Sequence, residues 1–319
     1  MELYPLKLSY VTKSPIWGGT RLLGDWNKQA DTPTIGESWE LTVRKEEKSK
    51  IVNGVYAGRT LESIIAEAGA NIIAPDYTGS EFPLLVKLID ACDRLSVQVH
   101  PDDEYAAREE NDRGKTEMWY IVEADEGAEI ICGLCDGATK TDFADAVRDG
   151  DPERVLKHCK VQAGETYFIP AGLPHAIGKG ILIAEIQQNC DLTYRVYDYN
   201  RRQPDGSLRQ LHVKKALDVV RPFSEDEIGE IRYSRRSDTL ANGEPLADCA
   251  FFRVERLRVS GSHTMPHSDG MRHLLALSGN AKLICNGKEY PVQKGDSYFL
   301  PPHLNITAEG ELLALVSGV

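Results

Sequence analysis

The stretch Gly164-Glu-Thr-Tyr-Phe-Ile-Pro-Ala-Gly-Leu-Pro-His175 decides the fold that this sequence predicts. It has the marks of a strand, then a tight turn, and then a second strand. Pro170 and Gly172 mark the turn, because proline fixes one backbone angle and glycine adopts conformations that other residues avoid. The turn displays His175 at the start of the second strand, where its imidazole is a candidate metal ligand.

A second stretch, Lys87-Leu-Ile-Asp-Ala-Cys-Asp-Arg-Leu-Ser-Val-Gln-Val-His-Pro-Asp102, brings polar side chains out of an otherwise apolar strand. Residues two apart in a strand point the same way, so Ser96, Gln98 and His100 share one face. The interior of a barrel or sandwich normally takes the apolar face, so the polar face suggests a metal or a small polar ligand. The alternative is a half-exposed strand whose polar face meets water, and this stretch alone does not separate the two.

The turn motif also points to a fold family. Its spacing, G-x5-P-x-G-x2-H, resembles the second conserved motif of the cupin superfamily, whose small β-barrels hold a metal ion inside with histidine and carboxylate ligands. A lone histidine near an apolar strand is usually structural. Two histidines and a glutamate in motifs on separate strands favour a metal site instead.

The candidate ligands come from three strands. His100, Glu117 and His175 are of the types that zinc or a similar divalent ion takes, and Gln98 can add an amide oxygen. Lys115 shares a strand face with Glu117, directly before an apolar run.

Composition limits the class of protein. At 319 residues and 41% hydrophobic, the chain is long enough for one large or two moderate domains without cross-links. A net charge of −12 opposes binding to nucleic acid or to an anionic membrane as a bulk property. No run approaches the ~18 apolar residues of a membrane span, and the first residues lack a secretory signal, so we expect a cytoplasmic protein. The seven cysteines, an odd number, fit reduced thiols.

The pattern along the chain predicts a mainly β fold of two cupin-type β-barrels (jelly-roll) with a few short helices. Helices are expected at residues 60–68, 102–111, 141–160 and 211–220, the third of them around an Asp149-Gly-Asp-Pro152 break, and an acidic linker at 224–231. We therefore expect a metal-binding catalytic cupin domain over residues 1–230, with N-terminal strands and helical insertions, and a cupin-like domain over 231–319.

The second domain is expected to be metal-free. Half of the turn motif recurs from Gly295 to Pro301, but Pro302-His303 follows in place of the displayed histidine. His263, His267 and His273 are predicted to be structural or surface residues, and the domain a packing partner.

Five motifs in order carry a closer resemblance: Gly36-Glu-Ser-Trp-Glu40, Gln98-Val-His-Pro-Asp102, Lys115-Thr-Glu117, Pro170-Ala-Gly-Leu-Pro-His-Ala176 and Asp191-Leu-Thr-Tyr-Arg195. Together they resemble the type I phosphomannose isomerases in their short bacterial form, over nearly the whole chain. The resemblance implies a double-cupin fold, a zinc site and reversible interconversion of mannose 6-phosphate and fructose 6-phosphate. It also implies roles for single residues, with Gln98, His100, Glu117 and His175 as metal ligands and Arg195 as a catalytic residue.

The chemistry of such a reaction asks for these residue types. Aldose–ketose isomerisation moves a proton between C1 and C2 through an enediol, so negative charge develops on the carbonyl oxygen. Zinc or a guanidinium can stabilise that charge. Lys115 and Glu185 are the candidate bases, with Lys87 behind them, and sequence alone does not rank them.

Three residues are candidates for substrate binding: Ser96, Lys87 and Arg201. Arg201 is expected to bind the phosphate at the mouth of the pocket, since a guanidinium can donate two parallel hydrogen bonds to two phosphate oxygens. The alternative for Arg201 is a solvated charge on a polar loop.

Two rival functions share the same ligands. One is a non-catalytic cupin module that holds metal and sugar without turnover, which would not need the set of Lys115, Glu185, Arg195 and Arg201. The other is a different metal-dependent cupin, such as a dioxygenase or the unrelated glucose 6-phosphate isomerase type. The expected partner is a phosphorylated hexose, with no nucleic acid and no membrane, and the sequence leaves the oligomeric state open.

Overall fold

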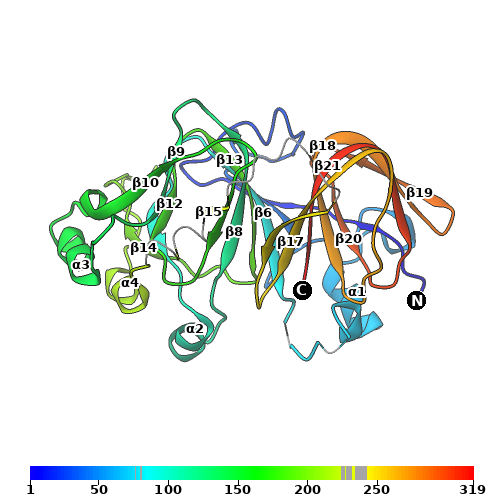
Figure 1. The fold of residues 1–319 in the computed structure, drawn as a ribbon, viewed down its shortest axis with the longest axis horizontal. Coiled ribbons are helices and arrows are strands. Elements are labelled where there is room, and N and C mark those ends of the chain that lie inside the picture. The colour runs from blue at the N-terminus through cyan, green and yellow to red at the C-terminus, as the bar shows by residue number, and fades with distance from the viewer. Residues whose placement is uncertain (76, 80, 224–226, 228–231, 234–242) are drawn as a thin grey trace.

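The computed structural model describes residues 1–75, 77–79, 81–223, 227, 232–233 and 243–319. They form a mainly β protein whose sheets follow one another along the long axis of the molecule (Figure 1). Within these ranges, no helix has both the length and the apolar character that a membrane crossing requires. All seven cysteines are thiols rather than disulfides, as expected.

A seven-stranded antiparallel sheet lies at the centre. In spatial order it contains β15 (Arg232–Tyr233), β11 (Thr166–Ile169), β8 (Glu117–Ala124), β13 (Ile181–Gln188), β6 (Leu84–Ala91), β3 (Glu37–Leu41) and β2 (Val11–Lys13). Every residue of β6 and β13 is buried. Both faces of this sheet are covered, which is why these two strands are nearly continuous apolar runs rather than clean alternations.

A five-stranded sheet covers one face of the central sheet. It contains β10 (Leu156–Lys160), β9 (Glu129–Leu134), β12 (His175–Ile177), β7 (Val97–Val99) and β14 (Tyr194–Tyr197). Ile89, Ile121 and Ile183 of the central sheet share one buried cluster with Ile130 and Ile177 of this second sheet. The polar residues that point into the same layer therefore lie between the two sheets.

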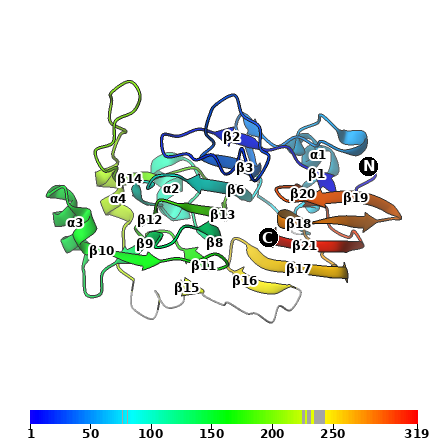
Figure 2. The same cartoon turned by 90° about the horizontal axis from the view of Figure 1, so that it is seen from above.

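A C-terminal sheet covers the other face. It runs β1 (Leu6–Lys7), β20 (Ser297–Leu300), β18 (Arg272–Cys285), β21 (Ile306–Gly318), β17 (Arg253–Thr264) and β16 (Glu244–Asp248), with β19 (Lys288–Gln293) paired to β18. Leu275, Phe299 and Leu315 pack in one cluster with Val86 and Ala184 of the central sheet. Figure 2 shows the resulting order of five-stranded, central and C-terminal sheets.

The strand β1 belongs to this last sheet although it lies at the start of the chain. Leu6 pairs with Phe299 and Lys7 with Tyr298. None of the strand orders among the described residues closes on itself. The expected mainly β fold is confirmed, whereas closed barrels are not.

Short helices complete the described fold: α1 (Leu61–Ala68), α2 (Asp103–Glu110), α3 (Lys140–Arg148), α4 (Val213–Val219), and the 3-10 turns η1 (Gly54–Tyr56), η2 (Ala70–Ile72) and η3 (Pro152–Val155). A hairpin joins β4 (Val43–Arg44) to β5 (Glu47–Lys48). Thr60 caps α1 by accepting a hydrogen bond from the Ser63 amide, as predicted.

One predicted element was wrong. The helix expected through Lys160 ends at Arg148, and Leu156–Lys160 forms the edge strand β10 against β9. Gly150 adopts a positive φ of 79° and Pro152 lies two residues later, so the helix does not continue past this point. Of the predicted linker at 224–231, only residue 227 lies within the described residues.

Candidate active site

Strand register brings the predicted polar residues together. In the central sheet, Glu185 on β13 stands opposite Lys87 on β6 and opposite Trp119 on β8. In the five-stranded sheet, Gln98 on β7 pairs with His175 on one side and Arg195 on the other. The two sets face each other across the layer between the sheets.

His100, Glu117 and His175 form a compact buried cluster, in which each residue is at most 1% exposed. The His100 Nε2 atom lies 3.4 Å from Glu117 Oε2 and 3.1 Å from His175 Nε2, and His175 Nε2 lies 3.5 Å from Glu117 Oε1. All three can offer a ligand atom to one ion. The residues predicted as metal ligands from separate strands therefore do converge.

The hydrogen bonds of the two histidines fix their tautomers. His100 Nδ1 lies 2.8 Å from the carbonyl oxygen of Leu192, and His175 Nδ1 lies 2.8 Å from that of Leu173. A carbonyl can only accept, so each Nδ1 carries the proton and donates it. Each Nε2 then directs a lone pair into the cluster, as metal-binding imidazoles do.

The charges in this cluster suit a cation. Burial, and after it the nearby Lys115 ammonium, lower the pKa of His100 to about 3, and burial also lowers the pKa of His175. Both rings are therefore neutral near pH 7. Burial opposes ionisation of Glu117, but the Lys115 ammonium and the two histidines together outweigh it and hold the pKa of that carboxyl well below its ordinary value.

The Nε2 lone pairs of the two imidazoles and the Glu117 carboxylate thus point toward one place in the cluster, and none of these atoms carries a proton. Neither oxygen of Glu117 accepts a hydrogen bond of good geometry from any described residue. Buried polar atoms are normally satisfied, and nitrogen and carboxylate donors suit a divalent ion of the zinc type. The residues present fit such an ion.

Gln98 and Lys115 join the cluster to its surroundings. The Gln98 Nε2 atom lies 3.4 Å from His175 Nε2. A flip of the side-chain amide, which exchanges its nitrogen and oxygen, would place Oε1 at this position. Lys115 Nζ lies 2.8 Å from Glu117 Oε2 and 3.5 Å from Glu185 Oε1. Burial opposes the charged form of Lys115, but the carboxylates of Glu117 and Glu185 outweigh it and raise its pKa.

Glu185 lies between two lysines. Its Oε1 atom is 3.6 Å from Lys87 Nζ, which also lies 3.6 Å from Glu37 and 3.7 Å from Asp191. Burial, and then the Glu117 carboxylate, raise the pKa of Glu185 against the pull of both lysines. Burial works against the charge on Lys87 as well, yet the surrounding carboxylates raise its pKa. Both lysines therefore stay protonated.

A cavity of about 320 Å³ opens beside this network. Its lining includes all the predicted catalytic residues, together with Ser96, Lys87 and Gln98: Pro15, Trp17, Glu37, Lys87, Ile89, Leu95, Ser96, Gln98, Lys115, Ile177, Glu185, Asp191, Thr193, Arg195 and Arg209. Arg195 Nε donates to Ser96 Oγ at 3.2 Å, and Arg195 Nη1 donates to the Gln210 carbonyl oxygen at 2.9 Å. The guanidinium of Arg195 is therefore held in place at the cavity wall.

Arg201 does not line this cavity. It pairs with Asp198 at 2.6 Å and with Asp93 at 3.2 Å. The residue that reaches the cavity instead is Arg209, whose Nε donates to Asp198 Oδ2 at 2.7 Å. Asp198 thus holds both arginines.

Sequence reasoning missed Arg209 and the cavity roles of Glu37 and Asp191. Glu37 lies in one of the quoted motifs and Asp191 in another, so their motif positions were a usable signal. Arg209 belongs to no motif and reaches the cavity through a loop.

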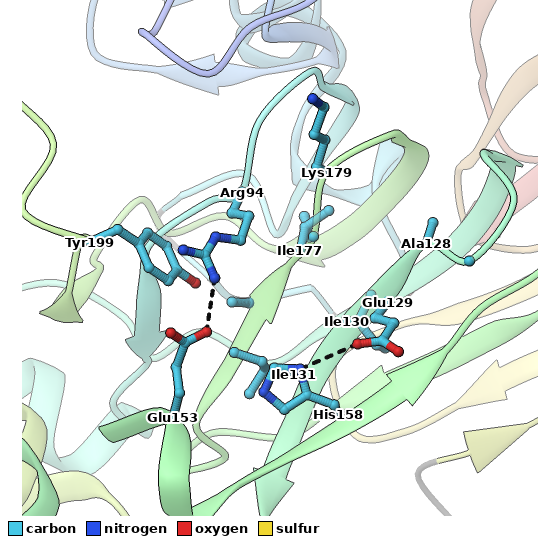
Figure 3. A pocket seen from close by; sticks show the side chains of 13 residues that line it. Arg94, Ala128, Glu129, Ile130, Ile131, Glu153, His158, Ile177, Lys179 and Tyr199 are labelled. Atoms are coloured by element: carbon cyan, nitrogen blue, oxygen red, sulfur yellow. Dashed lines mark hydrogen bonds and ion pairs between the residues drawn. The ribbon is translucent and has the colours of Figure 1, made fainter. Parts of the chain in front are cut away.

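A second cavity of about 220 Å³ lies against β9 and β12 (Figure 3), and Ile177 lines both cavities. Four of the charged or titratable side chains in the second cavity form two pairs, and Lys179 lines the cavity as well. Arg94 lies 2.9 Å from Glu153 and stacks 3.7 Å above the Tyr199 ring, and His158 lies 3.5 Å from Glu129. Both carboxylates of this lining are therefore paired.

Comparison with known proteins agrees with this geometry. Residues 5–143 match the family model "Phosphomannose isomerase type I, catalytic domain", and residues 244–318 match "Mannose-6-phosphate isomerase, cupin domain". The chain is 38% identical over 302 residues to mannose-6-phosphate isomerase ManA of Bacillus subtilis, covering 94% of each chain. It is 37% identical over 300 residues to the mannose-6-phosphate isomerase of Streptococcus mutans, covering 93% of this chain and 92% of that one.

Solved structures share the fold. A crystal structure of the mannose 6-phosphate isomerase from Bacillus subtilis superposes with a TM-score of 0.89 at 33% identity, covering 99% of both chains. A variant of phosphomannose isomerase from Salmonella typhimurium has a TM-score of 0.79 at 15% identity, over 98% of this chain and 99% of that one, and this likeness concerns the fold alone. The sequence motifs, the buried cluster and these matches together show that the chain belongs to the type I phosphomannose isomerase family.

Proposed function

We propose that this protein is a zinc-dependent isomerase that interconverts mannose 6-phosphate and fructose 6-phosphate through an enediol. One observation carries the proposal: a cluster built for a divalent ion borders a cavity that also holds a carboxylate between two lysines and two guanidinium groups. A module that only bound metal and sugar would not need that carboxylate and its lysines. The family relationship supports the same activity.

His100, Glu117 and His175 would hold the zinc ion, with Gln98 as a further ligand. When bound, the ion supplies a Lewis acid that stabilises negative charge developing on the sugar oxygens. Lys115 would keep Glu117 ionised, because its ammonium lies 2.8 Å from that carboxylate.

Glu185 is the group that we assign as the base. Lys87 and Lys115 have raised pKa values and stay protonated, so they are poor proton acceptors. Glu185 Oε1 is buried and accepts no hydrogen bond from a described residue, and its raised pKa brings it closer to neutral pH. The carboxylate would take the proton from C2 of mannose 6-phosphate and return it to C1, while a hydroxyl proton moves between O1 and O2.

Arg209 would meet the phosphate, while Arg195 would act on the reacting part of the sugar, as predicted. Burial, followed by repulsion from Arg209, lowers the pKa of Arg195, and Asp198 offsets this only in part. A phosphate bound by Arg209 would relieve that repulsion. Since Arg201 pairs with Asp198 outside the cavity, we propose that it positions Arg209 through Asp198 and that Arg209 takes the anchoring role predicted for Arg201. Ser96 and Lys87 would contact the substrate as predicted.

We also propose the domain division predicted from the sequence, with residues 1–230 as the metal-binding catalytic cupin domain and 231–319 as a cupin-like domain without a catalytic metal. In the second domain His273 is 1% exposed and lies 2.7 Å from Ser297 Oγ, so a hydroxyl partners its ring. Burial lowers the pKa of His273 to about 3.

The test is an isomerase assay on the zinc-loaded protein, with Glu185→Gln as the variant. We expect conversion of mannose 6-phosphate to fructose 6-phosphate by the natural chain, and loss of it in the variant with zinc retained. Tight binding of mannose 6-phosphate without conversion would instead identify a non-catalytic module.

A further inference from the structure

We propose that the C-terminal sheet carries a second, surface site for a divalent ion of the zinc class, formed by His267, Asp269 and His303. This inference is independent of the proposed function. It revises the prediction of a metal-free C-terminal domain, in which His267 is predicted from the sequence to be a structural or surface residue.

The distances match those of a metal site. His267 Nε2 lies 3.1 Å from Asp269 Oδ1, and His303 Nδ1 lies 3.5 Å from the same oxygen. Zinc bonds of about 2.0–2.1 Å in a tetrahedron separate neighbouring ligand atoms by roughly 3.3 Å, between these two values. In the buried cluster of His100, Glu117 and His175 the corresponding distances are 3.1–3.5 Å.

The three side chains come from two loops that the backbone holds together. His267 and Asp269 lie between β17 and β18, and His303 lies between β20 and β21. The His303 amide donates to the Ser268 carbonyl oxygen at 2.9 Å, and the Ser268 hydroxyl donates to the Gly270 carbonyl oxygen at 2.8 Å. The ligand atoms are therefore preorganised, which lowers the entropic cost of binding an ion.

His303 has an unusual backbone conformation. Its φ is 62°, in the left-handed region that most residues other than glycine avoid. At the matching place in the first copy of the turn motif, Gly172 adopts a φ of 86°. A glycine would meet this requirement without strain, so an imidazole at this turn has a cost that a ligand role would explain.

The donor set selects the class of ion. Two imidazoles and one carboxylate suit zinc and its transition-metal neighbours, whereas calcium and magnesium prefer oxygen ligands throughout. The side chains of His267, Asp269 and His303 are 60%, 68% and 62% exposed, so water would complete the coordination. We therefore expect weaker binding than in the buried cluster.

The two sites are separate. Strands β12 and β14, near the buried cluster, and the C-terminal sheet lie on opposite sides of the central sheet in both views (Figures 1 and 2). Variants at the surface site should therefore leave the buried cluster and the cavity unchanged.

The experiment is a calorimetric Zn²⁺ titration of the metal-stripped full chain. The natural protein should bind two ions in two classes of affinity, and His303→Asn should weaken the lower-affinity class at least about tenfold, since losing even an outer partner of a ligand costs that much. Asparagine tolerates positive φ, so the unfolding temperature should hold. Isomerase activity of the zinc-loaded variant should equal that of the natural chain.

His263→Asn, a change of another histidine in the same sheet, is the matched control and should keep both classes. His267→Gln is a second test variant and should act like His303→Asn, whereas Glu117→Gln should remove only the tighter class. A single ion per natural chain would overturn the proposal. Weak binding of equal strength in the natural chain, His303→Asn and His267→Gln would overturn it as well. Loss of the weaker class in His263→Asn would do the same.

Discussion

The proposed phosphate contact of Arg209 leads to a quantitative prediction for Arg209→Ala. A guanidinium has five N–H donors. In this structure the Nε and Nη2 groups of Arg209 bond to Asp198, which leaves the outer donors for a phosphate. Hydrogen bonds to a charged group contribute about 1.5–3 kcal/mol. Because 1.4 kcal/mol corresponds to a factor of ten, the variant should raise KM for mannose 6-phosphate by roughly 10–150-fold.

The turnover number should change little, because the phosphate takes no part in the proton transfer and binds in the ground state and transition state alike. Steady-state kinetics across a wide range of substrate concentrations separates the two constants. Arg202→Ala is the matched control: this nearby arginine donates to the Gly206 carbonyl oxygen and does not line the cavity. A KM within twofold of the natural value, or a loss confined to kcat, would refute the assignment of Arg209 to the phosphate.

Four further outcomes are expected. Replacing His175 by alanine should remove stoichiometric zinc and activity together, as metal analysis beside the isomerase assay would reveal; full zinc content with full activity would contradict the ligand assignment. Glu185→Gln should lower kcat at least about 100-fold with zinc content unchanged, since general-base catalysis contributes about 10²–10⁴-fold; near-normal turnover would move the base elsewhere. Arg195→Ala should mainly lower kcat with a modest change in KM, and a defect in KM alone would argue against a role in the reaction. Lys28→Met should destabilise the fold by about 3–5 kcal/mol in chemical denaturation, because it leaves the carboxylate of Glu40, 1% exposed and 2.7 Å from Lys28 Nζ, buried with a hydrogen bond from Ser38 but without its counter-ion; a variant as stable as the natural chain would disprove that estimate.

The ligand cluster could be predicted from the sequence because its evidence is local. Alternation along a strand assigns Gln98 and His100 to one face, and the turn motif displays His175 at a strand start. Pairing of β12 with β7 then brings these faces together. The position of the site between two sheets follows from the same alternation.

Arg209 could not be found in this way. It lies beyond β14, in a loop whose path depends on the pairing of its guanidinium with Asp198. Such a contact leaves no periodic signal, and Arg201, six residues after Arg195 in the sequence, was the more obvious candidate. The strand β10 was missed for a related reason: its partner β9 lies more than twenty residues earlier, and that pairing outweighs the helical pattern before it.

The pairing of β1 with β20 has a consequence for biosynthesis. On the ribosome, Leu6 emerges long before Phe299, its partner in the finished sheet. The face of the central sheet that Phe299, Leu275 and Leu315 cover therefore has no partner until translation is nearly complete. The nascent chain exposes this apolar surface during most of its synthesis. Contacts this distant in sequence also make folding slow. Premature termination a few codons before β21 would release a product that displays this surface, a natural target for chaperones and proteases.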